Sequence, residues 1–339
     1  MLRYSYQPMK VFRGFQHPDI APACALTVGN FDGVHRGHQA MLALLKAEAQ
    51  QRGIPSCVLT FEPHPRDYFA GVAHNAELAP ARVGTLRDKL IDLAACGVDQ
   101  TVVLPFDARL ASLSPQDFID RVLRRGLGAR YVLVGDDFRF GARRAGDYAT
   151  LDAAGVAHGF DVARMNSYQV HGLRVSSSAV RAALAAGQLD EAARLLGHPY
   201  RISGHVVHGR KLGRTLGFKT LNQRFAHWKP AASGIFTVQV EGLSAQPLPG
   251  VANLGVRPSL DPRDVNGGRV LLETHCLDWP AELGAEGAYG KIVRVALLHK
   301  LHDERKYDSL DALTAGIKAD CHEARAYFAQ HPTHDRTNS

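Results

Sequence analysis

Two histidines lie close together in a glycine-rich segment near the start of the chain, residues 29–38, which reads GNFDGVHRGH. An apolar run at residues 25–28 precedes this segment, and residues 41–45 after it carry apolar side chains at helical spacing. This order predicts a strand, a turn that brings backbone N–H groups close to a ligand, and a helix start that favours an anion. His35 and His38 would then face one phosphate and stabilise the charge of its transfer. A surface loop that holds two histidines by chance is the alternative, since the chain has 17 of them.

A second group suited to phosphate lies at the start of a predicted helix. Ser177 and Ser178 are expected to cap this helix, and Arg181, one turn further along, would face the same anion. An ordinary capped helix with a solvated arginine is the alternative. The presence of the histidine motif in the same domain favours phosphate binding.

A third candidate is the basic loop at residues 209–217, GRKLGRTLG, which lacks the Walker spacing. Its backbone N–H groups and a lysine would wrap ATP phosphates as an anion nest does. Thr220 and Asn222 follow at once, and their neutral oxygens suit Mg²⁺, which bridges phosphates. The loop residues predicted to bind phosphate are Gly209, Lys211, Gly213 and Gly217.

The first half of the chain, which positions the histidine turn, has the sequence pattern of an α/β fold. Apolar runs alternate there with helical patterns, which indicates a mostly parallel sheet covered on both faces. One helix is expected to open at Ser114, with a proline in its first position. Ligands of such sheets gather at the carboxyl ends of strands, so the segments 29–38 and 135–141 are expected to meet at one site. The predicted strands are residues 25–28, 57–61, 101–104 and 131–134.

The second half predicts a different architecture. Residues 177–196 have a helical pattern interrupted at Gly187, and the pattern then changes to strands with Gly- and Pro-containing turns and no intervening helices. This indicates a small, mostly antiparallel β-barrel. A terminal amphipathic helix is expected at residues 308–328. The predicted strands are residues 201–208, 234–240, 269–276 and 292–298.

Length and composition exclude several classes of protein. A chain of 339 residues favours two domains. The sequence has no run of about 18 apolar residues, so no membrane span is predicted. The first residues lack the apolar core of a signal peptide. Five scattered cysteines are typical of a reduced, cytoplasmic protein without a zinc or disulfide framework. The net charge of +7 favours anionic partners. The basic residues of the chain gather in short loops, which suits local phosphate sites better than a nucleic-acid groove.

These segments, in this order, resemble the bacterial bifunctional riboflavin kinase/FAD synthetase family from about Met9 to Phe328. The resemblance implies a Rossmann-like, nucleotidyltransferase-type sheet domain at 9–187 and a small antiparallel barrel with a terminal helix at 188–330. It also leaves residues 1–8 as an extension or makes Met9 the true start. The segments that carry the resemblance are 29–38, 61–65, 135–141, 175–181, 209–222, 250–258, 273–275 and 303–310.

The resemblance implies two ATP-consuming reactions. The second domain, a riboflavin kinase, would phosphorylate riboflavin to FMN. The first, an FMN adenylyltransferase, would join FMN to the AMP part of ATP and release pyrophosphate, giving FAD. ATP and Mg²⁺ are the implied cofactors, and the partners are small molecules (riboflavin, FMN and ATP) rather than nucleic acid or membrane. A cytoplasmic location follows.

The family motifs also imply roles for individual residues. His35 and His38 would bind ATP phosphates and stabilise the transition state, and Thr220 and Asn222 would hold the metal. Glu273 corresponds to the family's catalytic glutamate, which would accept the proton of the riboflavin 5′-hydroxyl. The residues expected to shape the turn around ATP are Gly29, Asn30, Phe31, Asp32 and Gly33, and those expected to contact flavin or nucleotide are Glu62, His64, Asp137, Asn253 and Arg257.

Two positions depart from the family pattern. Lys219 stands where the family has proline, and His302 stands where arginine is frequent. Both lie in the kinase domain, so a chain with only the adenylyltransferase active is one alternative. A basic nucleic-acid-binding protein on a nucleotidyltransferase-like scaffold is another.

Overall fold

The chain, seen in a computed structural model, forms two compact units. The structure describes residues 8–166, 168–170, 173–208, 218–225, 227, 229–257, 269–284 and 286–331. The first unit contains Met1–Pro80 and Lys89–Ser176, and the second contains Ala81–Asp88 and Ser177–Ser339. The chain therefore passes from one compact unit to the other after Pro80, after Asp88 and after Ser176, whereas the functional boundary expected at residue 187 stays a prediction.

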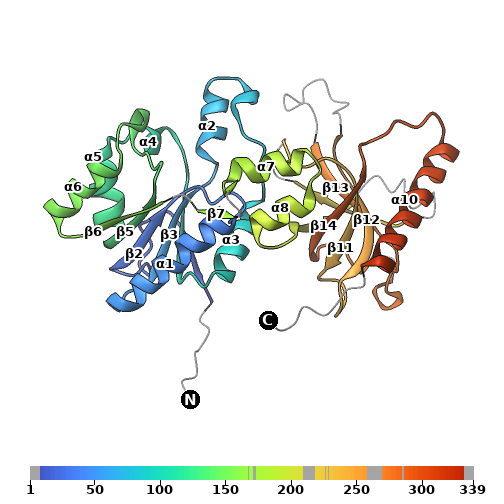
Figure 1. Ribbon diagram of the computed structural model, residues 1–339, viewed down its shortest axis with the longest axis horizontal. Helices are drawn as coiled ribbons and strands as arrows, with labels where there is room; N and C mark the ends of the chain where they lie inside the picture. Colours follow the sequence, from blue (N-terminus) through green and yellow to red (C-terminus); the bar gives the residue numbers. More distant parts are fainter. Residues whose placement is uncertain are drawn as a thin grey trace, which may run out of the picture. The chain divides into compact units, whose positions relative to one another are not determined.

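The first unit is built on a six-stranded parallel sheet with the order β1-β4-β3-β2-β5-β6 (Figure 1). This confirms the predicted parallel sheet and all four of its predicted strands, and adds an outer strand at each edge. The strands are β1 (Lys10–Arg13), β2 (Cys24–Val28), β3 (Ser56–Phe61), β4 (Gln100–Leu104), β5 (Ala129–Gly135) and β6 (Asp161–Met165), with a small hairpin of β7 (Gln169–Val170) and β8 (Leu173–Arg174).

Both faces of this sheet are buried. Successive side chains of a strand point to opposite faces, and on β2 they join two different apolar clusters. On β2, Leu26 joins an apolar cluster with Phe118 and Leu151, whereas Ala25 joins a second cluster with Leu42. The helical segments up to β6 are α1 (Arg36–Arg52), α2 (Pro65–Val72), η1 (Ala76–Leu78), α3 (Leu86–Ala95), α4 (Ala108–Ala111), α5 (Pro115–Asp117), η2 (Phe118–Gly126), η3 (Ala142–Arg144) and α6 (Tyr148–His158).

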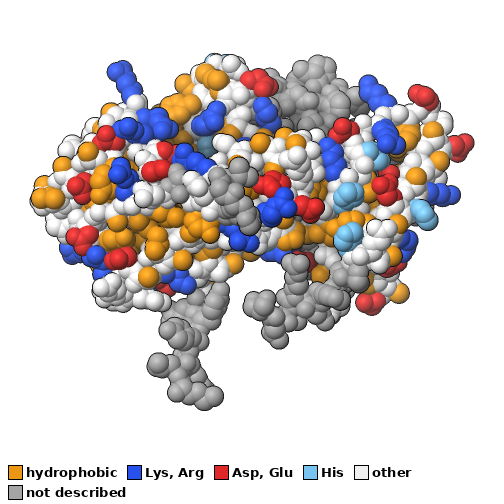
Figure 2. Space-filling view, in the orientation of Figure 1, with side chains coloured by type: hydrophobic (Ala, Val, Ile, Leu, Met, Phe, Trp, Pro, Cys, Tyr) orange, Lys and Arg blue, Asp and Glu red, His pale blue; other side chains and the backbone are white. Residues whose placement is uncertain are grey.

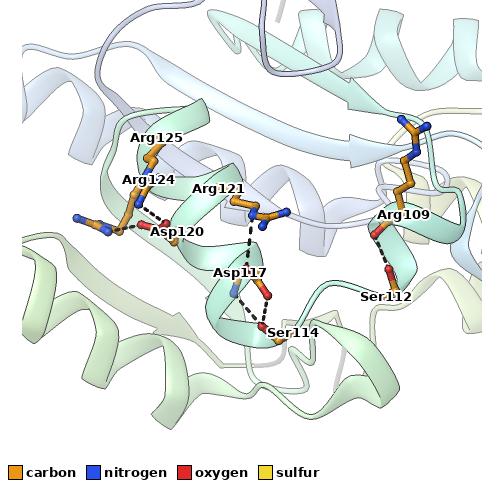
Figure 3. Close-up of polar contacts among 8 residues, drawn as sticks. All are labelled: Arg109, Ser112, Ser114, Asp117, Asp120, Arg121, Arg124 and Arg125. Atoms are coloured by element: carbon orange, nitrogen blue, oxygen red, sulfur yellow. Dashed lines mark hydrogen bonds and ion pairs between the residues drawn. The ribbon is translucent and has the colours of Figure 1, made fainter.

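Charged side chains of both signs are interspersed over the face shown in Figure 2, and α5 with η2 shows such pairing in detail (Figure 3). The helix opens at Ser114 as predicted, where Oγ accepts a hydrogen bond of 3.0 Å from the backbone N of Asp117. One turn later, Arg121 pairs with Asp117 at 3.4 Å, and Arg124 pairs with Asp120. The arginines of this surface are thus partly neutralised by carboxylates on the same helix.

The second unit is a closed antiparallel barrel with the order β10-β13-β12-β11-β14-β9, as predicted. The predicted helical stretch divides at Gly187 into two helices, and both belong to this unit. A 3-10 turn, η4 (Ala281–Leu283), follows β13. The remaining elements are α7 (Ser177–Ala185), α8 (Leu189–Leu196), β9 (Tyr200–Val207), β10 (Thr220–Arg224), β11 (Gly234–Glu241), β12 (Leu248–Arg257), β13 (Arg269–Cys276), β14 (Ile292–His302) and α10 (Leu310–Gln330).

The barrel interior is apolar, and the segment Ala81–Asp88, which ends in the first turn of α3, belongs to the same unit. Phe236, Val238 and Val240 alternate along β11 and are fully buried. The carboxylate of Asp88 accepts a hydrogen bond of 3.0 Å from the backbone N of Ser203 in β9. Within the described part of the chain, no helix is long and apolar enough to cross a membrane.

Candidate active sites

The first candidate site lies where the order of the parallel sheet reverses. From β2, the strands β3 and β4 lie to one side and β5 and β6 to the other. Open parallel sheets bind ligands at the carboxyl ends of the strands beside such a reversal. The histidine turn follows β2, and the segment after residue 135 follows its direct neighbour β5. Both segments therefore lie at the carboxyl ends of neighbouring parallel strands, and their meeting at one site stays a prediction.

The turn after β2 has a backbone conformation that side chains rarely adopt. Phe31 and Val34 have φ values of 48° and 35°, and both side chains are buried, so their packing stabilises this conformation. Gly33 has a φ of 88°, where glycine carries no steric cost. At Gly29 an added Cβ would stand 3.0 Å from the ring of Phe31. The conformation of the turn itself thus favours glycine at both positions.

The two histidines are brought together at the start of α1. His35, 6% exposed, is the N-cap residue, and its Nδ1 accepts a hydrogen bond of 3.3 Å from the backbone N of His38. The two imidazole rings stack with centroids 3.7 Å apart. A Cβ at Gly37 would stand 3.2 Å from Nδ1 of His35, so a residue without a side chain fits between the histidines. This geometry explains the spacing His-x-Gly-His.

The pKa of His38 lies well below its ordinary value of 6.5, chiefly because the ring is buried and then because His35 and Lys89 lie near it. Its Nδ1 is buried and has no hydrogen-bond partner within the described part of the chain. His38 is therefore a neutral imidazole at neutral pH.

The other residues predicted for this site lie in different environments. Asp32 is buried in the turn. Glu62 and His64 follow β3, and Nδ1 of His64 caps α2 by accepting a hydrogen bond of 3.1 Å from the backbone N of Arg66. His64 therefore has a structural role in addition to any contact with ligand. Asp137 is exposed after β5, with 83% of its side chain in solvent.

The two phenylalanines after β5 pack in the core of the first unit. Phe140 is buried, stacks on Phe138 with ring centroids 5.3 Å apart, and contacts Phe118 of η2. Neither ring belongs to the set predicted to bind flavin.

An aromatic cluster at the ends of β3 and β4 was missed by sequence reasoning. Phe61, Tyr68, Phe69 and Phe106 contact one another edge to face, with ring centroids 5.2–5.7 Å apart. Phe69 is 51% exposed although it is large and apolar. In the sequence, Phe69 lies shortly after the segment 61–65, and this position could have indicated the cluster. An exposed aromatic ring at a strand end can stack on a planar ligand.

Two polar residues behind the turn were also missed. Lys89 of α3 is 3% exposed, and its Nζ donates a hydrogen bond of 3.3 Å to Oγ1 of Thr60, in β3. Lys89 occupies an apolar position of the helical pattern formed by Leu86 and Leu93. A lysine at a core position was therefore the signal in the sequence.

The second predicted phosphate group lies in the second unit. Ser177 and Ser178 open α7, and Nε of Arg181 donates a hydrogen bond of 2.7 Å to the carbonyl oxygen of Ala81. That this group binds phosphate in the same reaction as His35 and His38 stays a prediction.

Three predicted kinase residues form one row across the barrel. Glu273 of β13 lies directly opposite Asn222 of β10 on one side and opposite Asn253 of β12 on the other. Residues directly opposite in antiparallel strands point to the same face. The barrel's apolar interior residues, such as Leu272, alternate with this row and point to the other face. The fold therefore gathers side chains that are far apart in the sequence.

The polar atoms of this row fit a hard cation. Asn222 is only 5% exposed, yet its Oδ1 has no hydrogen-bond partner within the described part of the chain, and the same holds for Oδ1 of Asn253. Thr220 lies two residues before Asn222 and shares its face of β10. Neutral oxygens with unsatisfied lone pairs suit Mg²⁺, which prefers oxygen ligands.

Some predicted residues of this domain cannot be placed. Arg257 ends β12, but its side chain lies outside the described part of the structure. The phosphate loop lies outside the described residues altogether, with Gly209, Lys211, Gly213 and Gly217.

The two departures from the family pattern have defined partners. Nζ of Lys219 lies 5.9 Å from the ring centroid of Trp279, and the backbone carbonyl oxygen of Lys219 lies 2.8 Å from Nδ1 of His275. Nε2 of His302, at the end of β14, lies 2.9 Å from Oδ1 of Asp320 in α10. His302 therefore connects the barrel to the terminal helix.

Comparison with known proteins agrees with this division into two sites. Residues 17–179 match the FAD synthetase family, and residues 196–328 match the riboflavin kinase family. A bifunctional riboflavin kinase/FMN adenylyltransferase of Escherichia coli K12 is 45% identical over 94% of this chain and 98% of its own length. The protein of the same name from Pseudomonas fluorescens is 45% identical over 90% of this chain and 93% of its own.

A solved structure extends this likeness to the fold. A Streptococcus pneumoniae protein described as a macrolide-efflux protein has a TM-score of 0.71 and 27% identity, covering 94% of this chain and 99% of that chain. On the strength of both domain matches and the full-length relatives, the chain belongs to the bifunctional riboflavin kinase/FMN adenylyltransferase family, whose two activities make FAD from riboflavin in two steps.

Proposed function

We propose that adenylyl transfer takes place at the turn after β2, with His35 and His38 as its catalytic residues. The observation that carries this proposal is the stacked histidine pair at a helix start, beside the reversal point of the sheet. In the reaction, an oxygen of the FMN phosphate attacks the α-phosphorus of ATP and pyrophosphate leaves. Both reactants are anions, so imidazole N–H groups and helix-start N–H groups stabilise the charge that develops.

Other predicted residues take part in the proposed adenylyl transfer. The turn residues from Gly29 to Gly33 wrap the nucleotide, and the motif of Ser177, Ser178 and Arg181 is assigned to a second phosphate from its sequence. The flavin ring stacks on the exposed aromatic cluster at α2, where hydrophobic side chains appear on the surface (Figure 2). Glu62, His64 and Asp137 contribute polar contacts at the neighbouring strand ends.

Phosphorylation of riboflavin takes place, in this proposal, at the polar row of the barrel. Glu273 accepts the proton of the riboflavin 5′-hydroxyl as that oxygen attacks the γ-phosphorus of ATP. Thr220 and Asn222 hold Mg²⁺, which neutralises phosphate charge when it is bound. The unsatisfied Oδ1 of buried Asn222 supports this assignment. Asn253 and Arg257 contact the flavin or nucleotide, and the basic loop with Lys211 wraps the ATP phosphates.

The net positive charge serves small phosphorylated ligands in this proposal, and not nucleic acid. The pairing of Arg121 with a carboxylate of α5, and of Arg124 with one of η2, supports this interpretation, since a nucleic-acid track needs unpaired cations. A cytoplasmic location is part of the same proposal, supported by five free cysteines and by bacterial biosynthetic relatives.

Two single substitutions test the assignment of the sites. His38→Ala is expected to abolish FAD formation from supplied FMN while riboflavin is still converted to FMN. Glu273→Gln is expected to do the reverse, because it removes only the base of the kinase. The activity that a variant retains shows that the unit without the substitution is folded. Loss of both activities in a folded single variant would contradict separate sites.

A further inference from the structure

A buried lysine and a threonine lie directly behind the histidine turn, and the assignment of sites above gives neither a role. Oγ1 of Thr60 donates a hydrogen bond of 3.2 Å to the carbonyl oxygen of Asn30, in the turn. The same Oγ1 accepts the hydrogen bond of 3.3 Å from Nζ of Lys89. The contacts therefore run from α3 through β3 to the turn. All of these residues lie in the first unit.

Burial of this lysine is costly unless its charge is used. Both side chains are buried, Thr60 completely. Lysine is almost never fully buried unless its ammonium group is paired, because desolvation of that group is unfavourable. A methionine or leucine would fill an apolar position of α3 at lower cost. The ammonium group of Lys89 is thus kept in the interior, one hydrogen bond away from the threonine that contacts the histidine turn.

We propose, on the basis of the adenylyltransferase site assigned above, that Lys89 is a positioning residue for adenylyl transfer, which acts through Thr60 to hold the turn that carries His35 and His38. The turn needs such support because Phe31 and Val34 are held at positive φ. The hydrogen bond at Asn30 anchors the turn at the residue before Phe31. When that anchor is lost, the imidazoles are no longer fixed relative to the ATP phosphates, and small misplacements are costly in phosphoryl chemistry.

Lys89 also acts on His38 through its charge. The groups that lower the pKa of His38 besides burial are His35, next to it on α1, and Lys89, from α3. Asp32, in the same turn, is a further buried titratable group. Removal of the lysine charge therefore raises the pKa of His38, although burial keeps it below 6.5. This effect is specific to an electrostatic role, since a purely structural lysine would leave the titration unchanged.

The test uses the full-length protein with four substitutions: Lys89→Met, Lys89→Arg, Thr60→Val and, as a matched control, Lys10→Met at an exposed position of β1. Steady-state kinetics of FAD formation from FMN give kcat/KM for ATP. NMR of the imidazole protons gives the titration of His38, assigned with His38→Gln. Conversion of riboflavin to FMN in the same samples shows that the second unit is folded, and thermal unfolding shows that the first unit is.

Lys89→Met is expected to lower kcat/KM for ATP in FAD formation by about tenfold or more, and to shift the titration of His38 to higher pH. Thr60→Val, which keeps the charge, is expected to lower kcat/KM with the titration of His38 unchanged. Lys89→Arg restores the titration, and Lys10→Met changes neither measurement. The outcome for Thr60→Val decides the matter if Lys89→Met does not fold.

The inference is wrong if folded Lys89→Met and Thr60→Val keep kcat/KM within about twofold of the Lys10→Met control. It is also wrong if the titration of His38 is the same with and without Lys89. His38→Ala separates this failure from failure of the proposed site. If His38→Ala abolishes FAD formation while the Lys89 and Thr60 variants keep it, only the positioning role is lost.

Discussion

At the scale of single residues, the proposed adenylyltransferase site contains an imidazole, that of His38, which burial keeps neutral. The low pKa of His38 follows from burial first and from His35 and Lys89 second. A neutral ring does not attract ATP by charge alone. It becomes a better phosphate ligand once the anion arrives, because a nearby negative charge favours the protonated form.

ATP binding is therefore expected to take up protons at mildly acidic pH. The phosphates raise the pKa of His38, so that between its low value in the free protein and its higher value in the complex the ring gains a proton on binding. Calorimetric titration of ATP in buffers with different ionisation enthalpies measures this uptake. His38→Gln removes the contribution of this site while the kinase site still binds ATP. Equal uptake by both proteins would show that His38 does not titrate with the ligand.

At the scale of elements, the position of His302 links β14 to α10. Its imidazole and the carboxylate of Asp320 are both largely buried, with 13% and 12% of each side chain exposed. Nδ1 of the same ring lies 2.7 Å from the carbonyl oxygen of Asp303. The residue that departs from the family pattern thus still has a carboxylate partner, which favours a folded and active kinase unit.

His302→Ala is expected to destabilise the second unit by about 2 kcal/mol, because it leaves the buried carboxylate of Asp320 without this partner. His302→Arg is expected to keep most of the stability, since a guanidinium group can bind the same carboxylate. Denaturant unfolding of both variants, followed together with FMN formation, gives the comparison. If His302→Ala unfolds at the same denaturant concentration as the parent chain, the link to α10 contributes nothing.

The strands and turns show how far a single sequence leads. The order β2, glycine turn and α1 could be predicted because an apolar run, glycines and helical spacing follow one another directly. By contrast, β10 and β12 were not predicted as strands, since TLNQR is mostly polar and LPGVANLGVR contains proline and two glycines. The row of Asn222, Glu273 and Asn253 is set by strand register, which joins residues far apart in the chain.

The contacts of Lys89 could not be derived from the sequence for the same reason. Nothing local indicates that its Nζ bonds to Thr60, 29 residues earlier. The sequence shows only that a lysine stands in an apolar pattern. The partner becomes visible once α3 packs on the sheet.

At the scale of the whole molecule, the two proposed catalytic motifs lie in two different compact units. The sheet unit carries the histidine pair, and the barrel unit carries the row of Asn222, Glu273 and Asn253. The product of the kinase is the substrate of the adenylyltransferase. Synthesis of FAD from riboflavin by one chain therefore requires both units to be active, in spite of Lys219 and His302.

The most direct test is chromatography of flavins after the purified protein has been incubated with ATP and Mg²⁺, once with riboflavin and once with FMN. We expect FMN and FAD from riboflavin, and FAD from FMN. FAD from FMN alone would show that the kinase unit has failed and would implicate Lys219 and His302. No conversion of either flavin would contradict the account as a whole.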